Sequence, residues 1–247
     1  DAMVPRHSIR LENVSFRYPE SRQDTLPGLS LTIPVGRAVC LAGPTGAGKS
    51  TTVDLLLGLL PPSAGGITVD GTLVTPGNVR AWQDNIGYVP QVIYLIDDTI
   101  ASNVALGIEP GDIDYPRLER AARIAELHDF VVNELEAGYQ TVVGERGARL
   151  SGGQRQRIGI ARALYHDPAV LILDEATNEL DLATEARILT SLRALGGRTI
   201  VFVSHKPSVA TFCDEVVVLE GGRIAAQGSY DELTAPGSRH RTLLQET

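Results

Sequence analysis

The fold is decided by one short stretch, AVCLAGPTGAGKS, at residues 38–50. Its first five residues form a compact apolar run, which predicts a buried strand. The eight residues that follow match the pattern G-x-x-x-x-G-K-[ST] in full. They are Gly43, Pro44, Thr45, Gly46, Ala47, Gly48, Lys49 and Ser50. A helix is expected next, at residues 50–60, and Pro61 and Pro62 are expected to stop it.

A strand, a glycine-rich turn and a helix in this order predict a phosphate-binding loop. The glycines let the backbone bend so that successive N–H groups surround a phosphate, and the helix N-terminus adds partial positive charge. Lys49 is expected to reach the β- and γ-phosphates of ATP, and the Ser50 hydroxyl to ligate Mg²⁺. Thr51, the next residue, is assigned to the same nucleotide site. The alternative is a glycine-rich turn that binds nothing, which the strand and helix on either side disfavour.

A second apolar run, VLILDE at residues 170–175, ends in two carboxylates. At the carboxyl end of a strand in a doubly wound sheet, such groups face the ligand crevice. Asp174 is suited to hold Mg²⁺, and Glu175 to polarise the attacking water as a general base. Alone, this pair would be interpreted as a solvated strand end. The phosphate loop alone fits GTPases, kinases and many motors, and together with this acidic pair it predicts nucleotide hydrolysis.

Composition limits the function classes. The net charge of −8, from 22 Lys and Arg against 30 Asp and Glu, argues against a general affinity for nucleic acid. Only two cysteines occur, Cys40 and Cys213, without a disulfide or zinc pattern, which fits a reducing compartment. No apolar run approaches the roughly 20 residues that a membrane span needs, and no signal-peptide pattern opens the chain. We therefore expect any membrane part to lie in another segment or another chain.

Periodicity divides the chain into an α/β core and a helical insert. Strands are expected at residues 9–16 and 29–33, both near a sheet edge, and at 67–69 and 86–89. Helices are expected at 100–106, 115–128, 130–136 and 152–166, so that residues 91–166 form an insert. Residues 170–173, 199–203 and 216–219 are nearly continuous apolar strands, as in buried parallel sheets. A helix is expected at 185–195, and a hairpin turn at 220–222 leads to a strand at 223–226.

The segment LSGGQ, residues 150–154, opens the last helix of the insert. Ser151 is expected to cap that helix, and the glycines to expose N–H groups at its N-terminus, which makes a second anion site. The alternative is an ordinary capped helix. The five residues closely resemble the signature sequence of the ATP-binding-cassette (ABC) ATPases. They also lie between the phosphate loop and the acidic strand, which is the order in that family.

The resemblance extends over nearly the whole chain and implies a fold. This is an α/β, RecA-like P-loop NTPase core with an N-terminal antiparallel β-subdomain and a helical signature subdomain. Residues 1–247 would form a single ABC ATPase domain, with the core and β-subdomain at 1–90 and 167–247 and the helical subdomain at 91–166. The resemblance also implies a head-to-tail dimer with an identical or paralogous ABC ATPase domain. Each ATP would lie between the phosphate loop of one protomer and the signature segment of the other, namely Ser151, Gly152, Gly153 and Gln154.

Three further positions resemble functional residues of the family. Tyr18 resembles the aromatic residue that stacks on adenine; the alternative is an exposed strand tyrosine. Gln91 resembles the glutamine that contacts Mg²⁺ and the attacking water and relays to the transport domain. His205 resembles the switch histidine that contacts the γ-phosphate. The resemblance thus implies Glu175, His205, Lys49 and Gln91 as catalytic residues, and Ser50, Gln91 and Asp174 as ligands of Mg²⁺.

One segment departs from the family pattern. Where the family commonly has Ser-Ala-Leu-Asp after the acidic strand, this chain has Asn178, Glu179, Leu180 and Asp181. Leu180 and Asp181 are retained, so the turn is expected to keep its shape. The asparagine and glutamate place the contacts across the dimer in question, and with them the coupling between the two ATP sites.

Two segments indicate a branch of the family. VGERG at residues 143–147 resembles a segment of exporter ATPase domains that faces the transmembrane part. YVPQVIYLIDDTI at 88–100 is similar to flippases of lipid-linked oligosaccharides and related lipid exporters. The implied protein is an exporter's nucleotide-binding domain at the cytoplasmic face of a membrane, attached through a transmembrane domain absent from this chain, with a lipid or glycolipid as a candidate substrate.

The alternatives are a soluble ABC ATPase acting on DNA or the ribosome and an importer ATPase subunit. The stretch between Lys49 and Ser151 has no heptads of the kind that DNA-repair members carry. Only one cassette is present, whereas ribosome-acting members usually carry two. The exporter-like segment at residues 145–147 disfavours an importer.

Overall fold

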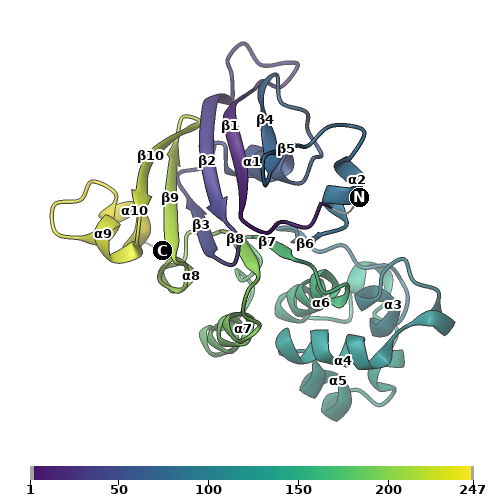
Figure 1. The fold of residues 1–247 in the computed structure, drawn as a ribbon. Helices are drawn as coiled ribbons and strands as arrows, with labels where there is room; N and C mark the ends of the chain where they lie inside the picture. Colours follow the sequence, from purple (N-terminus) through teal and green to yellow (C-terminus); the bar gives the residue numbers. More distant parts are fainter. Residues whose placement is uncertain (1–2, 246–247) are drawn as a thin grey trace. The chain divides into compact units, whose positions relative to one another are not determined.

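The computed structural model describes residues 3–245, which fall into two compact units. The first unit takes Asp1–Ile86 and Gly197–Thr247, and the second takes Gly87–Gly196. The first unit contains two sheets, and the second is mostly helical (Figure 1). The expected α/β class is confirmed by these elements.

An antiparallel sheet in the first unit consists of β1 (Ser8–Phe16), β2 (Leu26–Pro34), β4 (Ala64–Val69) and β5 (Thr72–Leu73). The strand order is β2-β1-β4-β5. In β1, the buried Leu11 pairs with Leu31 of β2 on one side and with Ile67 of β4 on the other. Because both edges of β1 are paired, its expected position near a sheet edge is wrong, whereas β2 does lie at the end of the strand order.

The second sheet supplies the first unit with its parallel strands. It contains β3 (Ala38–Ala42), β8 (Thr199–Val203), β9 (Glu215–Glu220) and β10 (Arg223–Gly228), in the order β10-β9-β3-β8. Leu41 of β3 pairs in parallel with Val203 and with Val217. The side chains of β8 are all buried, as its apolar run predicts. The carboxyl ends of β3, β8 and β9 therefore meet at one edge.

Among the residues that the structure describes, the first unit also carries five helices. The first of them stops at Leu56, four residues before the expected end, because Gly58 takes a left-handed φ of +66° that breaks the helix. The Trp82 ring nitrogen then donates to the Leu56 carbonyl at 2.7 Å, at this end of the helix. The helices are α1 (Lys49–Leu56), α2 (Val79–Gln83), α8 (Pro207–Phe212), α9 (Tyr230–Thr234) and α10 (Arg241–Gln245).

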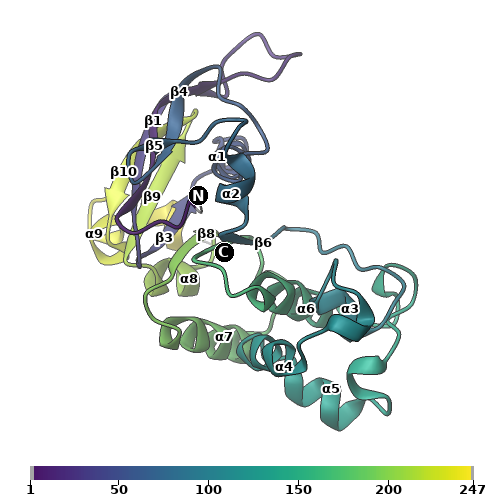
Figure 2. The ribbon, with the colours of Figure 1, turned by 45° about the vertical axis from the view of Figure 1, so that its right-hand side comes forward.

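The second unit gathers its helices around α6 (Figures 1 and 2). Its strands are β6 (Ile86–Val89), which begins at the unit boundary, and its neighbour β7 (Val170–Asp174). Its helices are α3 (Ile100–Val104), α4 (Tyr115–Ile124), α5 (His128–Glu134), α6 (Gly152–Tyr165) and α7 (Leu182–Ala194). Short 3-10 turns lie at Pro110–Asp112, Gly138–Gln140 and Glu145–Gly147.

Several helix boundaries in the second unit differ from expectation, and two of the differences have a clear cause. The helix expected at 115–128 ends four residues early, because α4 stops at Ile124 and Glu126 takes a φ of +55° before α5 begins. Helix α7 begins three residues early, at Leu182, because the Asp181 carboxylate accepts the Thr184 N–H at 3.0 Å and caps it. That same bond from the Thr184 backbone lowers the pKa of Asp181.

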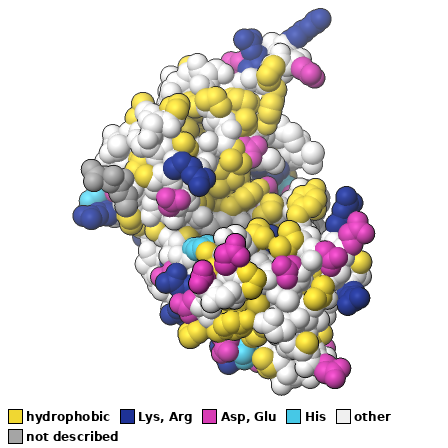
Figure 3. All heavy atoms as spheres, turned by 90° about the vertical axis from the view of Figure 1, so that its right-hand side faces the viewer, with side chains coloured by type: hydrophobic (Ala, Val, Ile, Leu, Met, Phe, Trp, Pro, Cys, Tyr) yellow, Lys and Arg dark blue, Asp and Glu magenta, His cyan; other side chains and the backbone are white. Residues whose placement is uncertain are grey.

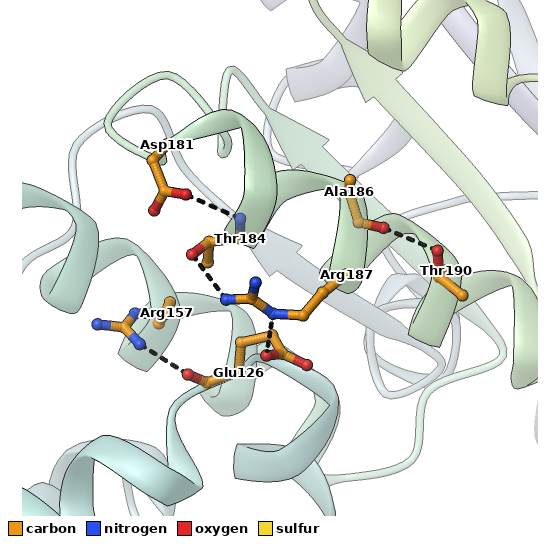
Figure 4. Close-up of polar contacts among 7 residues, drawn as sticks. All are labelled: Glu126, Arg157, Asp181, Thr184, Ala186, Arg187 and Thr190. Carbon is orange, nitrogen blue, oxygen red and sulfur yellow. Dashed lines mark hydrogen bonds and ion pairs between the residues drawn. The ribbon is translucent and has the colours of Figure 1, made fainter.

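The junction between α4 and α5 is tied to two other helices (Figure 4). The Arg187 side chain of α7 pairs with the Glu126 carboxylate at 2.7 Å and donates to Thr184 Oγ1 at 3.1 Å. The Arg157 guanidinium of α6 donates to the Glu126 carbonyl at 2.7 Å. Glu126, whose backbone is left-handed, therefore receives one contact from α6 and one from α7.

None of the helices formed by residues 3–245 has the length and apolar character needed to cross a bilayer.

Candidate functional site

The phosphate loop leaves the carboxyl end of β3 and leads into α1. Gly43 takes a φ of +144°, and a Cβ there would collide with the Leu219 carbonyl oxygen, so a side chain does not fit. Gly48, the N-cap of α1, takes a φ of +99° and provides no side-chain cap. The first turn of α1 contains no acidic residue. Its N–H groups are therefore available to an anion, as a phosphate loop requires.

Lys49 lies inside this loop. Its side chain is buried, and its ammonium donates to the carbonyls of Gly43 at 2.7 Å and Pro44 at 3.0 Å. Both bonds hold the positive charge over the loop backbone, where phosphate oxygens are expected. The sequence predicts that Lys49 binds the phosphates. In the structure, its ammonium contacts two carbonyl groups of the loop itself.

Tyr18 is joined to the helix that follows the loop. Its hydroxyl lies 3.2 Å from Thr51 Oγ1 on α1, and its ring meets the Phe16 ring edge-on with centroids 4.9 Å apart. The residue is 40% exposed, so part of the ring is accessible. A tyrosine fixed at both its ring and its hydroxyl is a suitable platform for a planar base.

His205 belongs to the same edge of the parallel sheet. The strand that precedes it, β8, runs beside β3, and the Ser204 N–H donates to the Leu41 carbonyl at 3.4 Å. The loops after β3 and β8 therefore start from neighbouring positions. Within the first unit, the structure thus brings together the phosphate loop, Tyr18 and the segment that carries His205.

The acidic residues form a second group, within the second unit. Asp174 ends β7 and is 8% exposed. The next residue, Glu175, has a left-handed φ of +49°, a conformation uncommon for a residue with a side chain. Gln91 follows β6 and donates its side-chain amide to Glu175 Oε2 at 2.8 Å. The structure therefore brings Gln91 and Glu175 together.

The signature segment has the expected cap. Ser151 is the N-cap of α6, its hydroxyl accepts the Gln154 N–H at 3.2 Å, and the Gln154 side chain accepts the Ser151 N–H at 2.8 Å. This reciprocal capping box satisfies two backbone donors. The predicted capping role of Ser151 is confirmed.

Asn178 is the contact that sequence reasoning missed. Its side-chain amide donates to Glu175 Oε2 at 3.0 Å, so the departure from the family pattern acts inside the chain. Gln156 was missed too; its buried Oε1 accepts the Glu179 N–H at 2.9 Å. The sequence offers one signal for the contact between Asn178 and Glu175: an amide side chain lies three residues after the predicted general base. That separation is the one that a tight turn closes.

The assigned metal ligands have the right chemistry for Mg²⁺. Ser50, Asp174 and Gln91 offer hydroxyl, carboxylate and amide oxygens, which are the hard donors that this ion prefers. Within the part of the chain that the structure describes, no three His, Cys, Asp or Glu side chains form a metal-binding group. Mg²⁺ in phosphate sites is commonly held by only one or two protein groups with substrate phosphates, so this donor set fits.

The charged side chains are mixed on the face drawn in Figure 3. Lys and Arg lie singly or in small groups among Asp and Glu and form no continuous basic stripe among the described residues of that face.

Comparison with known proteins agrees with these features. A family model described as ABC transporter matches residues 26–178, which is more than half the chain. The chain is 42% identical over 226 residues to an ATP-dependent lipid A-core flippase of Cupriavidus pinatubonensis, covering 91% of this chain and 38% of the flippase. It is 41% identical over 240 residues to P-glycoprotein 14 of Caenorhabditis elegans, covering 96% and 18% respectively. The chain therefore spans less than half the length of these relatives.

A solved structure is similar over almost the whole chain. It is a bacterial Atm1-family ABC exporter with ATP bound, and it matches with a TM-score of 0.91 and 37% sequence identity. The match covers 98% of this chain and 42% of the exporter chain.

Proposed function

This chain belongs to the ABC transporter family, and on that basis we propose that it is the nucleotide-binding domain of an ABC exporter. It binds MgATP between two head-to-tail protomers and hydrolyses it to drive transport across a membrane. The relatives named above and the similar Atm1-family exporter support the exporter branch. The transmembrane domain is the second partner, and the chain lies at the cytoplasmic face of the membrane.

One observation carries the hydrolytic part of the proposal. Glu175 follows β7 with a left-handed backbone, and its carboxylate accepts the Gln91 amide at 2.8 Å. An oriented carboxylate of this kind can accept a proton from a water molecule. The amide partner gives this carboxylate a fixed orientation beside the end of β7.

The chemistry assigns a separate task to each residue. Glu175 accepts a proton from water as the water oxygen attacks the γ-phosphorus and the bond to the β,γ-bridging oxygen breaks, which gives ADP and phosphate. Lys49 binds the phosphate oxygens, and His205 contacts the γ-phosphate. Positioning and electrostatic stabilisation supply most of the rate enhancement in phosphoryl transfer.

The remaining residues bind and orient ATP. Tyr18 stacks on the adenine, and the backbone N–H groups of residues 43 and 45–51 surround the phosphates, with Pro44 contributing only to the bend of the loop. Mg²⁺, when bound, neutralises charge on the β- and γ-phosphate oxygens. Ser50, Asp174 and Gln91 are the residues that would hold it.

We assign a second protomer to each site because the N-terminus of α6 is a second anion site in the same chain. Ser151, Gly152 and Gly153 form it, and a head-to-tail dimer uses it on the partner's ATP. The lipid A-core flippase relative favours a lipid or glycolipid as the transported substrate.

The test is ATP turnover by wild-type and Glu175→Gln chains at concentrations that permit pairing. We expect a loss of about 100-fold or more, because general-base catalysis contributes on that order. ATP affinity is expected to stay unchanged. Glu134→Gln, at an exposed position of α5, is the control and is expected to leave turnover intact. Unchanged turnover in Glu175→Gln would contradict the proposed hydrolysis.

The transport part needs its own experiment. The transporter that contains this chain is reconstituted in liposomes with a labelled glycolipid, and movement between leaflets is followed with ATP and with a non-hydrolysable analogue. ATP-dependent movement supports a glycolipid substrate, and ATP turnover that is indifferent to added glycolipid contradicts it.

A further inference from the structure

Asn178 contacts Glu175 at two points. Its backbone N–H donates to the Glu175 carbonyl at 3.2 Å, which closes a turn, and its side-chain amide donates to Glu175 Oε2 at 3.0 Å. The first bond holds the left-handed backbone of Glu175, whose φ is +49°. The second holds the end of the side chain. One residue thus restrains both the conformation and the direction of the carboxylate.

The carboxylate oxygen involved is shared with Gln91. A carboxylate oxygen offers about two acceptor directions. In Glu175 Oε2, Gln91 takes one at 2.8 Å and Asn178 takes the other at 3.0 Å. Two amide donors from different segments fix the plane of the carboxylate, and with it the position of Oε1. With a single donor, the carboxylate group could still rotate.

The turn that carries Asn178 is itself anchored on α6. The Glu179 N–H donates to Oε1 of Gln156, a side chain that is only 4% exposed, at 2.9 Å. A Cβ on Gly152 would collide with the Glu179 carboxylate, and a Cβ on Gly153 would lie 3.0 Å from the Glu179 carbonyl oxygen. Glu179 therefore lies directly against the first turn of α6. Asn178 reaches Glu175 from a rigid base.

We propose that Asn178 is a positioning residue for hydrolysis: it orients the Glu175 carboxylate, from a turn that α6 holds in place. The departure from the family's usual serine therefore acts on the general base of the same chain. This inference rests on the proposed role of Glu175. It goes beyond that role because it assigns a task to Asn178, to which the proposed function gives none.

The experiment measures steady-state ATP turnover, ATP affinity and thermal stability for four chains: wild type, Asn178→Ala, Asn178→Asp and Glu175→Ala. In Asn178→Ala we expect kcat to fall about two- to tenfold, the rate equivalent of one hydrogen bond, with KM and ATP affinity unchanged. In Asn178→Asp the fall should be larger, because a carboxylate would stand 3.0 Å from Glu175 Oε2 and repel it. Asn133→Ala, at an exposed position of α5, is the matched control and should behave as wild type.

A double variant separates positioning from general damage. Single-turnover assays with protein in excess follow the slow residual reaction of Glu175→Ala. If Asn178 acts through Glu175, adding Asn178→Ala to Glu175→Ala causes no further loss. A loss that multiplies with that of Glu175→Ala overturns the inference, as does a wild-type kcat in Asn178→Ala. A fall in thermal stability or a rise in KM that accounts for the lower turnover also overturns it.

The two proposals fail in different ways. Full turnover in Glu175→Ala contradicts the proposed function itself. Loss of turnover in Glu175→Ala with normal turnover in both Asn178 variants contradicts only the positioning role.

Discussion

The hydroxyl of Tyr18 and the hydroxyl of Thr51 lie 3.2 Å apart. The contact joins the tyrosine that follows β1 to α1, the helix that follows the phosphate loop. If Tyr18 and the loop have their proposed roles, the contact gives the adenine-stacking ring and the phosphate-binding loop a common support in α1. Movement of α1 on nucleotide binding would therefore reach the ring of Tyr18 as well.

Removal of this hydroxyl contact should weaken ATP binding moderately. Tyr18→Phe keeps the ring but loses one hydrogen bond, worth about 0.5–1.5 kcal/mol, so we expect a two- to tenfold rise in the Kd for ATP. Tyr18→Ala removes the ring and should weaken binding further. Titration calorimetry measures both. Tripolyphosphate, which has no base, is the control ligand; if its affinity falls as much as that of ATP, Tyr18 does not act on the base.

Gly43→Ala should disrupt the phosphate loop. The new Cβ would collide with the Leu219 carbonyl oxygen at a φ of +144°, so the loop must shift. Backbone strain of this kind costs about 1–3 kcal/mol, and we expect ATP affinity to fall about five- to 100-fold. Gly71→Ala is the matched control, since Gly71 also has a positive φ, of +81°, but a Cβ there meets no atom within 4 Å. An equal loss of ATP affinity in both variants would refute the role of the collision.

Ser151→Ala should affect both stability and turnover. Loss of this N-cap costs about 1 kcal/mol of folding free energy, which denaturant unfolding measures. Helix α9 carries a second capping box, formed by Ser229 and Glu232, so Ser229→Ala is a matched control. Both variants should lose comparable stability. Only Ser151→Ala should also lower ATP turnover, and an equal effect of Ser229→Ala on turnover would point to stability alone.

The ion pair at the α4–α5 junction should contribute little to stability and depend on salt. Glu126 and Arg187 are 2.7 Å apart, but their side chains are 26% and 54% exposed. Such pairs contribute about 0–1 kcal/mol, so Glu126→Gln should lower the unfolding free energy by less than about 1 kcal/mol at low salt. The difference should disappear in 1 M salt, where the screening length is about 3 Å. Asp24→Asn, which breaks the looser 4.0 Å pair with Arg17, should have no measurable effect.

Stability should depend on pH through Asp181. The Thr184 N–H lowers the pKa of this carboxyl in the folded chain, so the folded state favours the ionised form. Its contribution is fully present above the unfolded pKa of about 3.9 and is lost as pH falls through the lower native value. Asp181→Asn keeps a cap but not the charge. The stability difference between wild type and this variant should therefore shrink below about pH 4; a difference that stays constant through that range would contradict the assignment.

Much of the fold was predictable because its elements carry local patterns. The apolar runs of β3, β8 and β9 gave the parallel strands, and the G-x-x-x-x-G-K-[ST] loop gave the turn into α1. The boundaries were less predictable where single residues decide them. Gly58 ended α1 before the prolines did, and Glu126 broke the helix expected at 115–128 although glutamate favours helices. Short helices such as α2 and α8 have too few turns to show a period.

The candidate site was predictable where residues follow one another in the chain. Ser151 and Gln154 form their capping box within four residues, so the motif contains the geometry. Gln91 and Glu175 are 84 residues apart, and only the family resemblance suggested a common role. The Asn178 contact could not be foreseen, because it depends on the left-handed backbone of Glu175, which glutamate does not ordinarily adopt.

The capping box at the start of α6 has a consequence for assembly kinetics. The first turn of this helix is closed by Ser151 and Gln154 of the same chain, so this turn would not have to fold on binding to the proposed second protomer. Ordering a segment on binding consumes part of the interaction energy, and a conformational change required for binding lowers the association rate. Association at this surface is then a collision of preformed parts, and its rate should rise in proportion to protein concentration without a lag for helix formation.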